Sequence, residues 1–279
     1  MKEKAYGKVN LHLDVLGKRL DHYHNLEMVM APLHLHDIVT FKVLEDDKII
    51  IESNKKITAK PEDNLVYKIA KYLKERFNIQ KGIKIYIEKH IPIAAGLAGG
   101  SADAAATLRG MNKLFNLNLT LIKLAEIGEM FGADIPFCVH NKLCIARGKG
   151  EALYFLKVKL NLPILLITPK IKVSTKEVFS KVKMDTIRNV KITTMTNAIY
   201  NKNTHLVAQR LYNALEPFAF TLYPEIKTLK DSLIKQGYEG VLMSGSGPTV
   251  FVIDQKLKIL KALAEQYQDD FTVNLSKIQ

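Results

Sequence analysis

The chain has 279 residues, which is enough for one large domain or for two of ordinary size. Apolar residues make up 47% of it and charged residues 25%, so the composition is globular and excludes a low-complexity or fibrous chain. The formal net charge of +13 predicts attraction for anions, which include nucleic acid, membrane surfaces and phosphorylated small molecules.

Neither a membrane span nor a secretory signal is apparent in the sequence. The longest wholly apolar runs, such as PILLI at Pro163–Ile167, are far shorter than the roughly 20 residues that cross a bilayer. The stretch MKEKAYGKVNLHLDV has no apolar block of the kind found in secretory signals. Cys138 and Cys144 form no C-x-x-C pair, and two reduced thiols are expected. We therefore expect a cytoplasmic protein that does not bind a membrane.

Period-2 alternation predicts a first strand, with Val9, Leu11, Leu13 and Val15 on one face and Lys8, Asn10, His12 and Asp14 on the other. Further predicted strands of the first half cover Ile38–Leu44, Lys48–Glu52 and Ile83–Lys89, with two short ones in Leu143–Phe155 turning at Gly148–Gly150. Predicted helices cover Asn64–Phe77, Ala102–Phe115 and Leu121–Phe131. Asp63 or Asn64 is the expected cap of the first of these helices, and Gly132 ends the third.

The second half begins with a predicted buried strand at Leu162–Thr168. Predicted helices follow at Thr175–Lys183, Thr204–Glu216, Tyr223–Gln236 and Lys256–Tyr267, and predicted strands at Gly240–Ser244, Thr249–Ile253 and Thr272–Leu275. Strands and helices are mixed without strict βαβ alternation, which indicates an α+β fold. We place a domain boundary near Phe155–Leu162.

Positive charge gathers in the segment Lys170–Lys191, which contains seven basic residues, namely Lys170, Lys172, Lys176, Lys181, Lys183, Arg188 and Lys191. Glu177 and Asp185 are its only acidic residues, and Phe179 is its only aromatic one. Binding of single-stranded nucleic acid usually needs several aromatic platforms. The charge therefore weakly favours a small anionic ligand, and a solvated lysine face is the ordinary alternative.

The stretch Ile91–Gly110, IPIAAGLAGGSADAAATLRG, places glycines and a serine directly before strong helix formers. A helix N-terminus attracts phosphate through its unpaired N–H groups and partial positive charge, and glycines let the backbone approach the anion. Gly96, Gly99, Gly100 and Ser101 have this character, and Ser101 is also the expected N-cap. A tight strand-to-helix connection would need only one or two glycines. Because the pattern is neither Walker A nor G-x-G-x-x-G, we predict phosphate binding without a dinucleotide fold.

The pattern P-x-x-x-G-L-A-G-G-S-A-D-A-A, which starts at Pro92, resembles the central motif of the GHMP kinases. Three further stretches agree in order: YGKVNLHLDVLGKRLDHYHNLEMVM near the start, GADIPFCV at Gly132–Val139 and SGSGPTVF at Ser244–Phe251. The resemblance implies a two-domain α+β GHMP kinase fold, with the active site in the cleft between the domains. A ribosomal S5 domain 2-like domain would cover residues 1–157 and a ferredoxin-like domain residues 158–279.

The resemblance also implies an ATP phosphotransferase that acts on an alcohol group. The form with G-G-S-A-D is most similar to the branch that phosphorylates the 2-hydroxyl of 4-diphosphocytidyl-2-C-methyl-D-erythritol, giving the 2-phosphate and ADP. That reaction belongs to isoprenoid precursor biosynthesis by the non-mevalonate pathway. The implied partners are therefore ATP and a cytidine-diphosphate-linked sugar alcohol, with no nucleic acid, and the implied protein is a monomer or a weak homodimer.

Two residues receive catalytic roles from the resemblance. Asp134 would be the general base, although its spacing alone favours a helix cap; a general base typically contributes about 10²–10⁴-fold in rate. Lys8, which would ordinarily be a solvated lysine on the polar face of its strand, would orient Asp134 and neutralise charge during transfer.

The nucleotide would be bound by residues around the glycine loop. The matching positions are Asn64, Lys89, Pro92, Gly96, Leu97, Ala98, Gly99, Gly100, Ser101 and Ala102. Asn64 and Lys89 would line the adenine pocket. Without the resemblance, Asn64 would be interpreted as a helix cap and Lys89 as a surface lysine. For Asp103 we favour interaction with the helix dipole over contact with Mg²⁺, the metal expected with ATP, and we assign no metal ligands.

The acceptor would be bound by residues from three stretches, namely Asn10, Tyr23, His24, Thr175, Phe179, Gly245, Ser246 and Gly247. The resemblance suggests a cytosine between Tyr23 and Phe179, with His24 reading its edge. Each aromatic residue alone is more often part of a core. Ser244–Pro248 reads equally as a simple hairpin turn.

The sequence departs from the family at one point of the acceptor loop, and two alternative functions stay open. Family members usually have D-G-Y-H where this chain has Asp21-His22-Tyr23-His24, so the acceptor loop is expected to differ if that site has a positive φ. A GHMP kinase for homoserine or a mevalonate-like alcohol would leave the aromatic pair nothing to stack on. A non-catalytic RNA-binding relative would bind RNA with steep salt dependence and would not need Asp134.

Overall fold

The computed structural model of the chain describes residues 1–21 and 23–279. It divides into two compact units. The first contains Met1–Gly7, Leu35–Ile93 and Ala98–Asn141, and the second contains Lys8–His34, Ala94–Leu97 and Lys142–Gln279. The division at residues 157 and 158 stays a prediction. His22, whose effect on the acceptor loop we questioned, lies outside the described residues.

Two long strands take part in both units. The first predicted strand extends over β1 (Lys2–Lys18), and the strand predicted at Ile38–Leu44 is the second half of β2 (His24–Leu44). In the first unit, β4 (Gly82–Glu88) pairs with the second half of β2 in antiparallel register and with β3 (Ile49–Ser53) in parallel register. The side chains of Ile83, Ile85 and Ile87 are fully buried, as their alternation in the sequence predicts.

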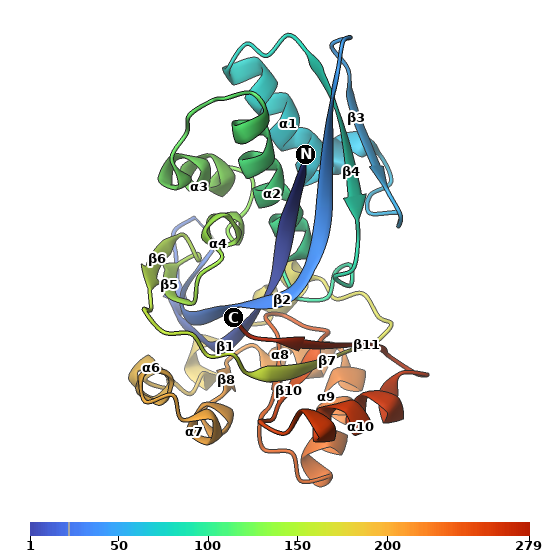
Figure 1. The fold of residues 1–279 in the computed structure, drawn as a ribbon. Helices are drawn as coiled ribbons and strands as arrows, with labels where there is room; N and C mark the ends of the chain where they lie inside the picture. The colour runs from blue at the N-terminus through green and yellow to red at the C-terminus, as the bar shows by residue number, and fades with distance from the viewer. Residues whose placement is uncertain (22) are drawn as a thin grey trace. The chain divides into compact units, whose positions relative to one another are not determined.

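The helices of the first unit are η1 (Pro61–Asp63), α1 (Leu65–Arg76), α2 (Gly99–Leu114), α3 (Leu121–Glu129) and α4 (Ile135–His140). Helices α1 and α2 lie side by side in Figure 1. Asn64 caps α1, because its side chain accepts a hydrogen bond from the Val66 N–H at 3.0 Å, as predicted.

The start of α2 corrects one prediction. The helix begins at Gly99, three residues before the predicted Ala102, and its N-cap is Ala98, with a φ of 56°, rather than Ser101. A Cβ on Gly99 would lie 3.1 Å from Ile91 Cγ2 and 3.2 Å from Lys89 Nζ. Close packing therefore favours glycine at a position that is already helical, and Gly99 and Gly100 belong to the first turn instead of the loop before it.

In the second unit, β2 continues into a small antiparallel arrangement. Its first half pairs with β5 (Cys144–Gly148), which pairs with β6 (Ala152–Phe155), as the predicted turn at Gly148–Gly150 requires. On the other side, β1 pairs in parallel with the two-residue strand β8 (Tyr212–Asn213), with Leu13 opposite Asn213.

A four-stranded antiparallel sheet completes the second unit. Its spatial order is β11 (Thr272–Lys277), β7 (Pro163–Thr168), β10 (Val250–Ile253) and β9 (Val241–Met243). Helices α9 (Pro224–Lys235) and α10 (Leu257–Tyr267) lie on the same side of this sheet in Figure 1. Counted along the chain from β7, the order is 4-1-3-2 with a helix after the first and third strands, which is the ferredoxin-like pattern.

The remaining helices of the second unit are α5 (Thr175–Ser180), η2 (Met184–Thr186), α6 (Ile192–Tyr200), α7 (Thr204–Gln209) and α8 (Glu216–Leu222). The single helix predicted over Thr204–Glu216 is wrong, because α7 ends at Gln209 and the chain then forms β8. Pairing with β1 overrides the helical propensity of these residues. No helix among the described residues is long and apolar enough to span a membrane.

Candidate active site

The first turn of α2 is the predicted phosphate-binding element of the first unit. The Ala102 N–H donates to the Ala98 carbonyl at 2.9 Å, and the N–H groups of a helix's first turn have no partner within the helix. A Cβ added to Gly100 would meet no atom within 4 Å, so the backbone of this residue borders open space. The turn therefore has open space beside Gly100 at the positive end of a 16-residue helix.

A buried cluster of three charges lies behind this turn. The Lys89 ammonium donates to Asp37 and, at 2.7 Å, to Asp103 Oδ2, and all three side chains are at most 3% exposed. Asp37 also accepts the N–H groups of His90, at 2.6 Å, and Ile91, at 2.8 Å. The cluster thus ties β2, the end of β4 and, through Asp103, the N-terminal part of α2 together.

The two carboxylates of this cluster are not equivalent. Asp103 Oδ1 is buried without a hydrogen-bond partner among the described residues, whereas each oxygen of Asp37 has at least one. Burial raises the pKa of Asp103; the Lys89 charge opposes this rise and the Asp37 charge adds to it. Burial alone would lower the pKa of Lys89, but the charges of Asp103 and Asp37 outweigh it and raise that pKa. Lys89 is therefore a cation buried in the fold and not the surface lysine of the ordinary reading.

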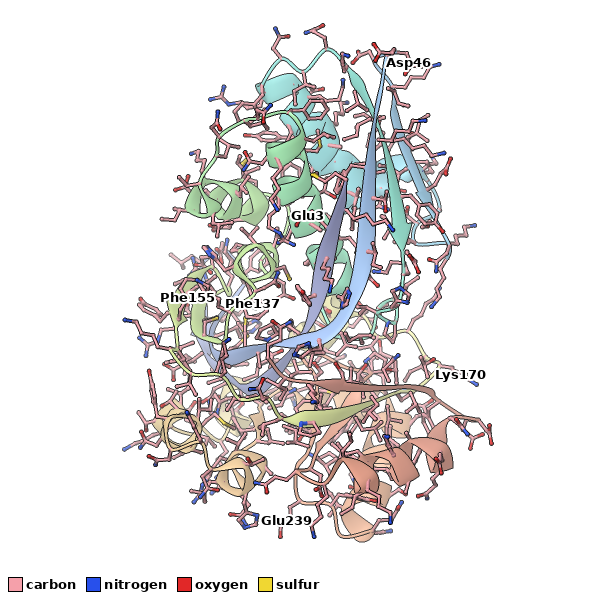
Figure 2. All side chains as sticks on the ribbon, in the orientation of Figure 1. Glu3, Asp46, Phe137, Phe155, Lys170 and Glu239 are labelled. Carbon is pink, nitrogen blue, oxygen red and sulfur yellow. The ribbon has the colours of Figure 1, made fainter. Side chains whose placement is uncertain are left out.

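Asp134 lies immediately before α4 and does not cap it. It occupies the N-cap position with helical backbone angles, and its side chain makes no capping hydrogen bond. The helix itself is fixed by Arg109 of α2, which donates to the Cys138 carbonyl at 2.8 Å and to the Val139 carbonyl at 3.3 Å. Figure 2 labels Glu3, which pairs with Arg109 at 3.2 Å. The placement of Asp134 thus depends on α2, whose first turn carries the glycines.

In the second unit, the polar face of β1 is buried. Lys8 is 5% exposed, Asn10 is fully buried, and the Lys8 ammonium donates to Asn10 Oδ1 at 2.7 Å. The Lys8 N–H donates to the Leu97 carbonyl at 3.0 Å, which joins this strand to the glycine loop. Burial lowers the pKa of His12, on the same face, to about 4. This face is not solvated, as an ordinary polar face would be, and the Lys8 amine and the Asn10 amide are among its buried polar groups.

The Ser244–Gly247 turn lies against the same two side chains. Ser244 Oγ donates to the Gly96 carbonyl at 3.0 Å. A Cβ added to Gly245 would lie 3.4 Å from the Gly96 carbonyl oxygen and 3.7 Å from both Lys8 Nζ and Asn10 Oδ1. The second unit therefore brings predicted catalytic, nucleotide and acceptor residues together, namely Lys8, Asn10, Gly96 and Gly245.

The predicted acceptor residues of α5 also find partners in the second unit. Thr175 Oγ1 and Ser246 Oγ share a hydrogen bond of 2.8 Å, and the Phe179 ring stacks on His24 at 5.4 Å between ring centroids. Tyr23 is 60% exposed, and the Lys149 ammonium lies over its ring at 5.4 Å. Burial and the Lys18 charge lower the pKa of His24. The sandwich of a cytosine between Tyr23 and Phe179 stays a prediction.

Other sequence predictions remain open. Lys8 belongs to the second unit and Asp134 to the first, so their pairing stays a prediction. Pro92 is partly exposed at the end of the first unit's Leu35–Ile93 segment. Among the residues that the structure describes, no three His, Cys, Asp or Glu side chains gather as a metal site. Asp103 does not fit a Mg²⁺ ligand, because it is buried and bound to Lys89.

Sequence reasoning missed Asp37, Arg109, Asn213 and Glu216. Asp37 was detectable as the only carboxylate in the run Met28–Phe41 of its strand, which has no Lys or Arg. The others carry no local signal, because Arg109 reads as the exposed side of a helix and Asn213 and Glu216 fall in a stretch that reads as helical.

Comparison with known proteins places this fold and these motifs in one family. The model of the GHMP kinases N terminal domain matches residues 64–142, and that of the GHMP kinases C terminal domain matches residues 195–271. The chain is 44% identical to a 4-diphosphocytidyl-2-C-methyl-D-erythritol kinase of Bacillus cereus (strain B4264), over 89% of this chain and 86% of that one. It is also 44% identical to the enzyme of the same name from Enterococcus faecalis (strain ATCC 700802 / V583), over 91% and 90%.

Comparison with solved structures supports the same family assignment. A crystal structure of 4-(cytidine 5'-diphospho)-2C-methyl-D-erythritol kinase superimposes with a TM-score of 0.86 at 29% identity, covering 100% of this chain and 99% of that one. L. major mevalonate kinase shares the fold alone, with a TM-score of 0.77 at 16% identity over 100% and 96%. The chain therefore belongs to the GHMP kinases, small-molecule kinases, and within them to the family of the 4-diphosphocytidyl-2-C-methyl-D-erythritol kinases that it matches. The predicted family, fold class and enzyme class are confirmed.

Proposed function

We propose that the chain transfers the γ-phosphoryl group of ATP to the 2-hydroxyl of 4-diphosphocytidyl-2-C-methyl-D-erythritol, giving the 2-phosphate and ADP. The observation that carries this proposal is the 44% identity to kinases of that name over about nine-tenths of the chain. The reaction supplies isoprenoid precursors by the non-mevalonate pathway. We further propose that the protein acts in the cytoplasm as a monomer or weak homodimer and does not bind nucleic acid.

In the proposed reaction the first turn of α2 binds the phosphates of ATP. The backbone N–H groups of Gly99, Gly100 and Ser101 donate to phosphate oxygens, and the missing side chain of Gly100 permits the approach. Asn64 and Lys89 lie at the ends of elements that would border the adenine. Mg²⁺ typically takes few protein ligands and several phosphate oxygens, so we propose that it arrives with ATP and neutralises the phosphate charge.

Asp134 and Lys8 perform the chemistry in this proposal. The carboxylate of Asp134 accepts the proton of the 2-hydroxyl as that oxygen bonds to the γ-phosphorus, and the bond between this phosphorus and the β,γ-bridging oxygen breaks to release ADP. The Lys8 ammonium, which Asn10 orients at 2.7 Å, stabilises the negative charge that spreads over the transferring group.

Acceptor recognition falls to the second unit. Tyr23 and Phe179 offer aromatic faces for the cytosine, and His24 offers a ring nitrogen to its edge. Thr175 and Ser246, joined at 2.8 Å, and the glycines Gly245 and Gly247 would contact the sugar alcohol and its diphosphate. The exposed lysines of Lys170–Lys191 attract this dianionic ligand, so part of the positive net charge would serve substrate binding.

An assay of ADP release with three acceptors tests the proposal. We expect turnover with 4-diphosphocytidyl-2-C-methyl-D-erythritol, and at least about 10³-fold lower kcat/KM with homoserine or mevalonate, which lack the nucleotide that the aromatic side chains would bind. Free CDP should compete with the first acceptor. Turnover with homoserine or mevalonate alone would reject the proposed substrate but keep the kinase, and tight RNA binding without turnover would reject both.

A further inference from the structure

We propose that Asn213 and Glu216 form a clip that positions the Ser244–Gly247 turn for phosphoryl transfer. The two residues are the first and last of the sequence NALE, through which β8 passes into α8. The catalytic part of this inference rests on the proposed function, because it requires the turn to serve the reaction. The clip itself is defined by the contacts of the second unit alone.

The clip binds both backbone groups of Met243, the last residue of β9. The Met243 N–H donates to Glu216 Oε1 at 3.0 Å, and the Met243 carbonyl accepts a hydrogen bond from Asn213 Nδ2 at 2.8 Å. Strand β9 is the edge of its sheet, and the next residue, Ser244, donates its N–H to Thr249 of the neighbouring chain segment. Because alternate residues of an antiparallel ladder turn their backbone groups away from the neighbour, those of Met243 face the open edge. Two side chains thus replace the missing strand.

Asn213 reaches beyond the strand into the turn itself. Its Nδ2 group also donates to the Gly245 carbonyl at 2.8 Å, so one amide holds the residues on both sides of Ser244. Gly245 and Gly247 have φ values of 57° and 88°, a region that glycine enters at little cost. Such a turn has many accessible conformations, and the amide selects one of them.

The clip is itself firmly anchored. Asn213 is 3% exposed, its Oδ1 accepts the Leu215 N–H at 2.9 Å, and its strand pairs with β1. Glu216 accepts two hydrogen bonds, of 2.7 and 2.6 Å, from the Lys230 ammonium of α9. Every polar group of the Asn213 amide therefore has a partner, and the bond from Leu215 to its Oδ1 anchors the side chain independently of the turn.

Strand β1 connects the clip to the proposed chemistry. It carries Lys8 and Asn10, and five residues after Lys8 it pairs with Asn213 through Leu13. The Ser244–Gly247 turn places Gly245 beside Lys8 and Asn10. Within it, Ser244 Oγ donates a hydrogen bond to the Gly96 carbonyl. One strand thus fixes both the amine and the clip. A misplacement of about 1 Å in such a site can cost on the order of 10²-fold in rate.

The variant Asn213→Ala tests this inference, with Asn203→Ala as its matched control. Asn203 lies in the same unit, and its side chain also accepts a backbone N–H, that of Leu206 at 3.0 Å, but it caps α7 and contacts nothing in the turn that the structure records. We expect both variants to lower the melting temperature. We expect only Asn213→Ala to lower kcat per folded molecule by roughly 10- to 100-fold and to raise the acceptor KM. Glu216→Gln, which keeps an oxygen for Met243, should retain more activity than Glu216→Ala.

Amide hydrogen exchange provides a readout that needs no substrate. Peptides that cover residues 243–247 should exchange faster in Asn213→Ala than in the wild type, and not in Asn203→Ala. Unchanged exchange in this segment would overturn the clip. Faster exchange with an unchanged kcat and KM would overturn its role in positioning. A wild type that fails to phosphorylate the proposed acceptor would reject the proposed function, while the exchange data would still decide whether the clip exists.

Discussion

The two units hold their glycine-bearing segments in place by different means. In the first unit, side chains bind one another: Lys89 joins Asp37 to Asp103 and so fixes the N-terminal part of α2. In the second unit, side chains bind backbone: Asn213 and Glu216 hold the peptide groups of Met243 and Gly245 directly.

The difference follows from the backbone of each segment. The turn of α2 already belongs to a 16-residue helix whose hydrogen bonds set its conformation, so only the orientation of the helix has to be fixed. Charge pairs between elements are sufficient for this. The Ser244–Gly247 turn has two glycines at positive φ and no regular ladder beyond β9, so its own peptide groups must be bound. A rigid helix such as α2 can be positioned by side chains that contact it beyond its first turn. A conformationally permissive turn such as Ser244–Gly247 needs direct hydrogen bonds to its own peptide groups.

The largest effect is expected from Asp134→Asn, which tests whether the first unit supplies the base. The amide cannot accept the hydroxyl proton, so kcat should fall by about 10²–10⁴-fold or more, while ATP binds almost as before. Steady-state kinetics and calorimetric titration with ATP measure the two quantities. Asp46→Asn, at an exposed carboxylate of the same unit that pairs with Lys48, is the control and should leave both unchanged. A near-normal kcat in Asp134→Asn would remove Asp134 from the mechanism.

An effect on stability is expected from Gly96→Ala, set against Gly100→Ala. Gly96 has a φ of 71°, and its added Cβ would lie 2.4 Å from the Ser244 carbonyl oxygen, so the free energy of unfolding should fall by roughly 1–3 kcal/mol. Gly100 is helical with space around it, so alanine should keep this free energy or raise it by up to about 1 kcal/mol. Urea unfolding measures both changes.

The variants Gly96→Ala and Gly100→Ala also test whether the first turn of α2, unlike the loop at Gly96, contacts the nucleotide. If phosphate approaches the first turn of α2, the methyl group of Gly100→Ala should raise the KM for ATP by roughly tenfold, equivalent to about 1.4 kcal/mol, without loss of stability. An unchanged KM for ATP would place the phosphates elsewhere. Equal loss of stability in both variants would contradict the distinction between a conformational and a ligand-contacting glycine.

Much of the fold could be predicted from the sequence, because its signals are local. Alternation identified β4, the spacing of apolar residues identified α1, and the predicted helix at Lys256–Tyr267 matches α10, each within about two residues. The prediction failed at Thr204–Glu216, where pairing of Tyr212 with His12 replaces the helix. That contact joins residues 200 positions apart, and no local pattern contains it.

The candidate site was predictable only where residues fall in the family's motifs. The burial of Lys8 and Asn10 together was consistent with their shared strand face, and the motif around Gly245 indicated the turn beside them. The supporting residues were not predictable. Asn213 and Asp37 acquire their roles from backbone groups 30 to 54 residues away, and an isolated polar residue in a sequence does not reveal such a partner.

The smallest effect is expected from Asp103→Asn, and it tests the charge cluster of the first unit. Burial raises the pKa of Asp103 in the folded protein, so the folded state holds this proton more tightly than the unfolded state. The stability that the protonated form contributes is fully present below the ordinary pKa of aspartate and is lost as the pH rises through the folded pKa. Asp103→Asn removes this titration, so its melting temperature relative to the wild type should rise from acid to neutral pH.

The variant Lys89→Met tests whether the pH dependence comes from the charges around Asp103 or from a general loss of packing. The Lys89 charge opposes the rise in the pKa of Asp103, so its removal should extend the loss of stability to higher pH and make the total loss larger, opposite to the effect of Asp103→Asn. Melting curves of both variants across the same pH series measure this contrast. A difference between Asp103→Asn and the wild type that is the same at every pH would mean that Asp103 does not titrate differently in the folded state. The contrast between the two units would then be one of geometry and not of charge.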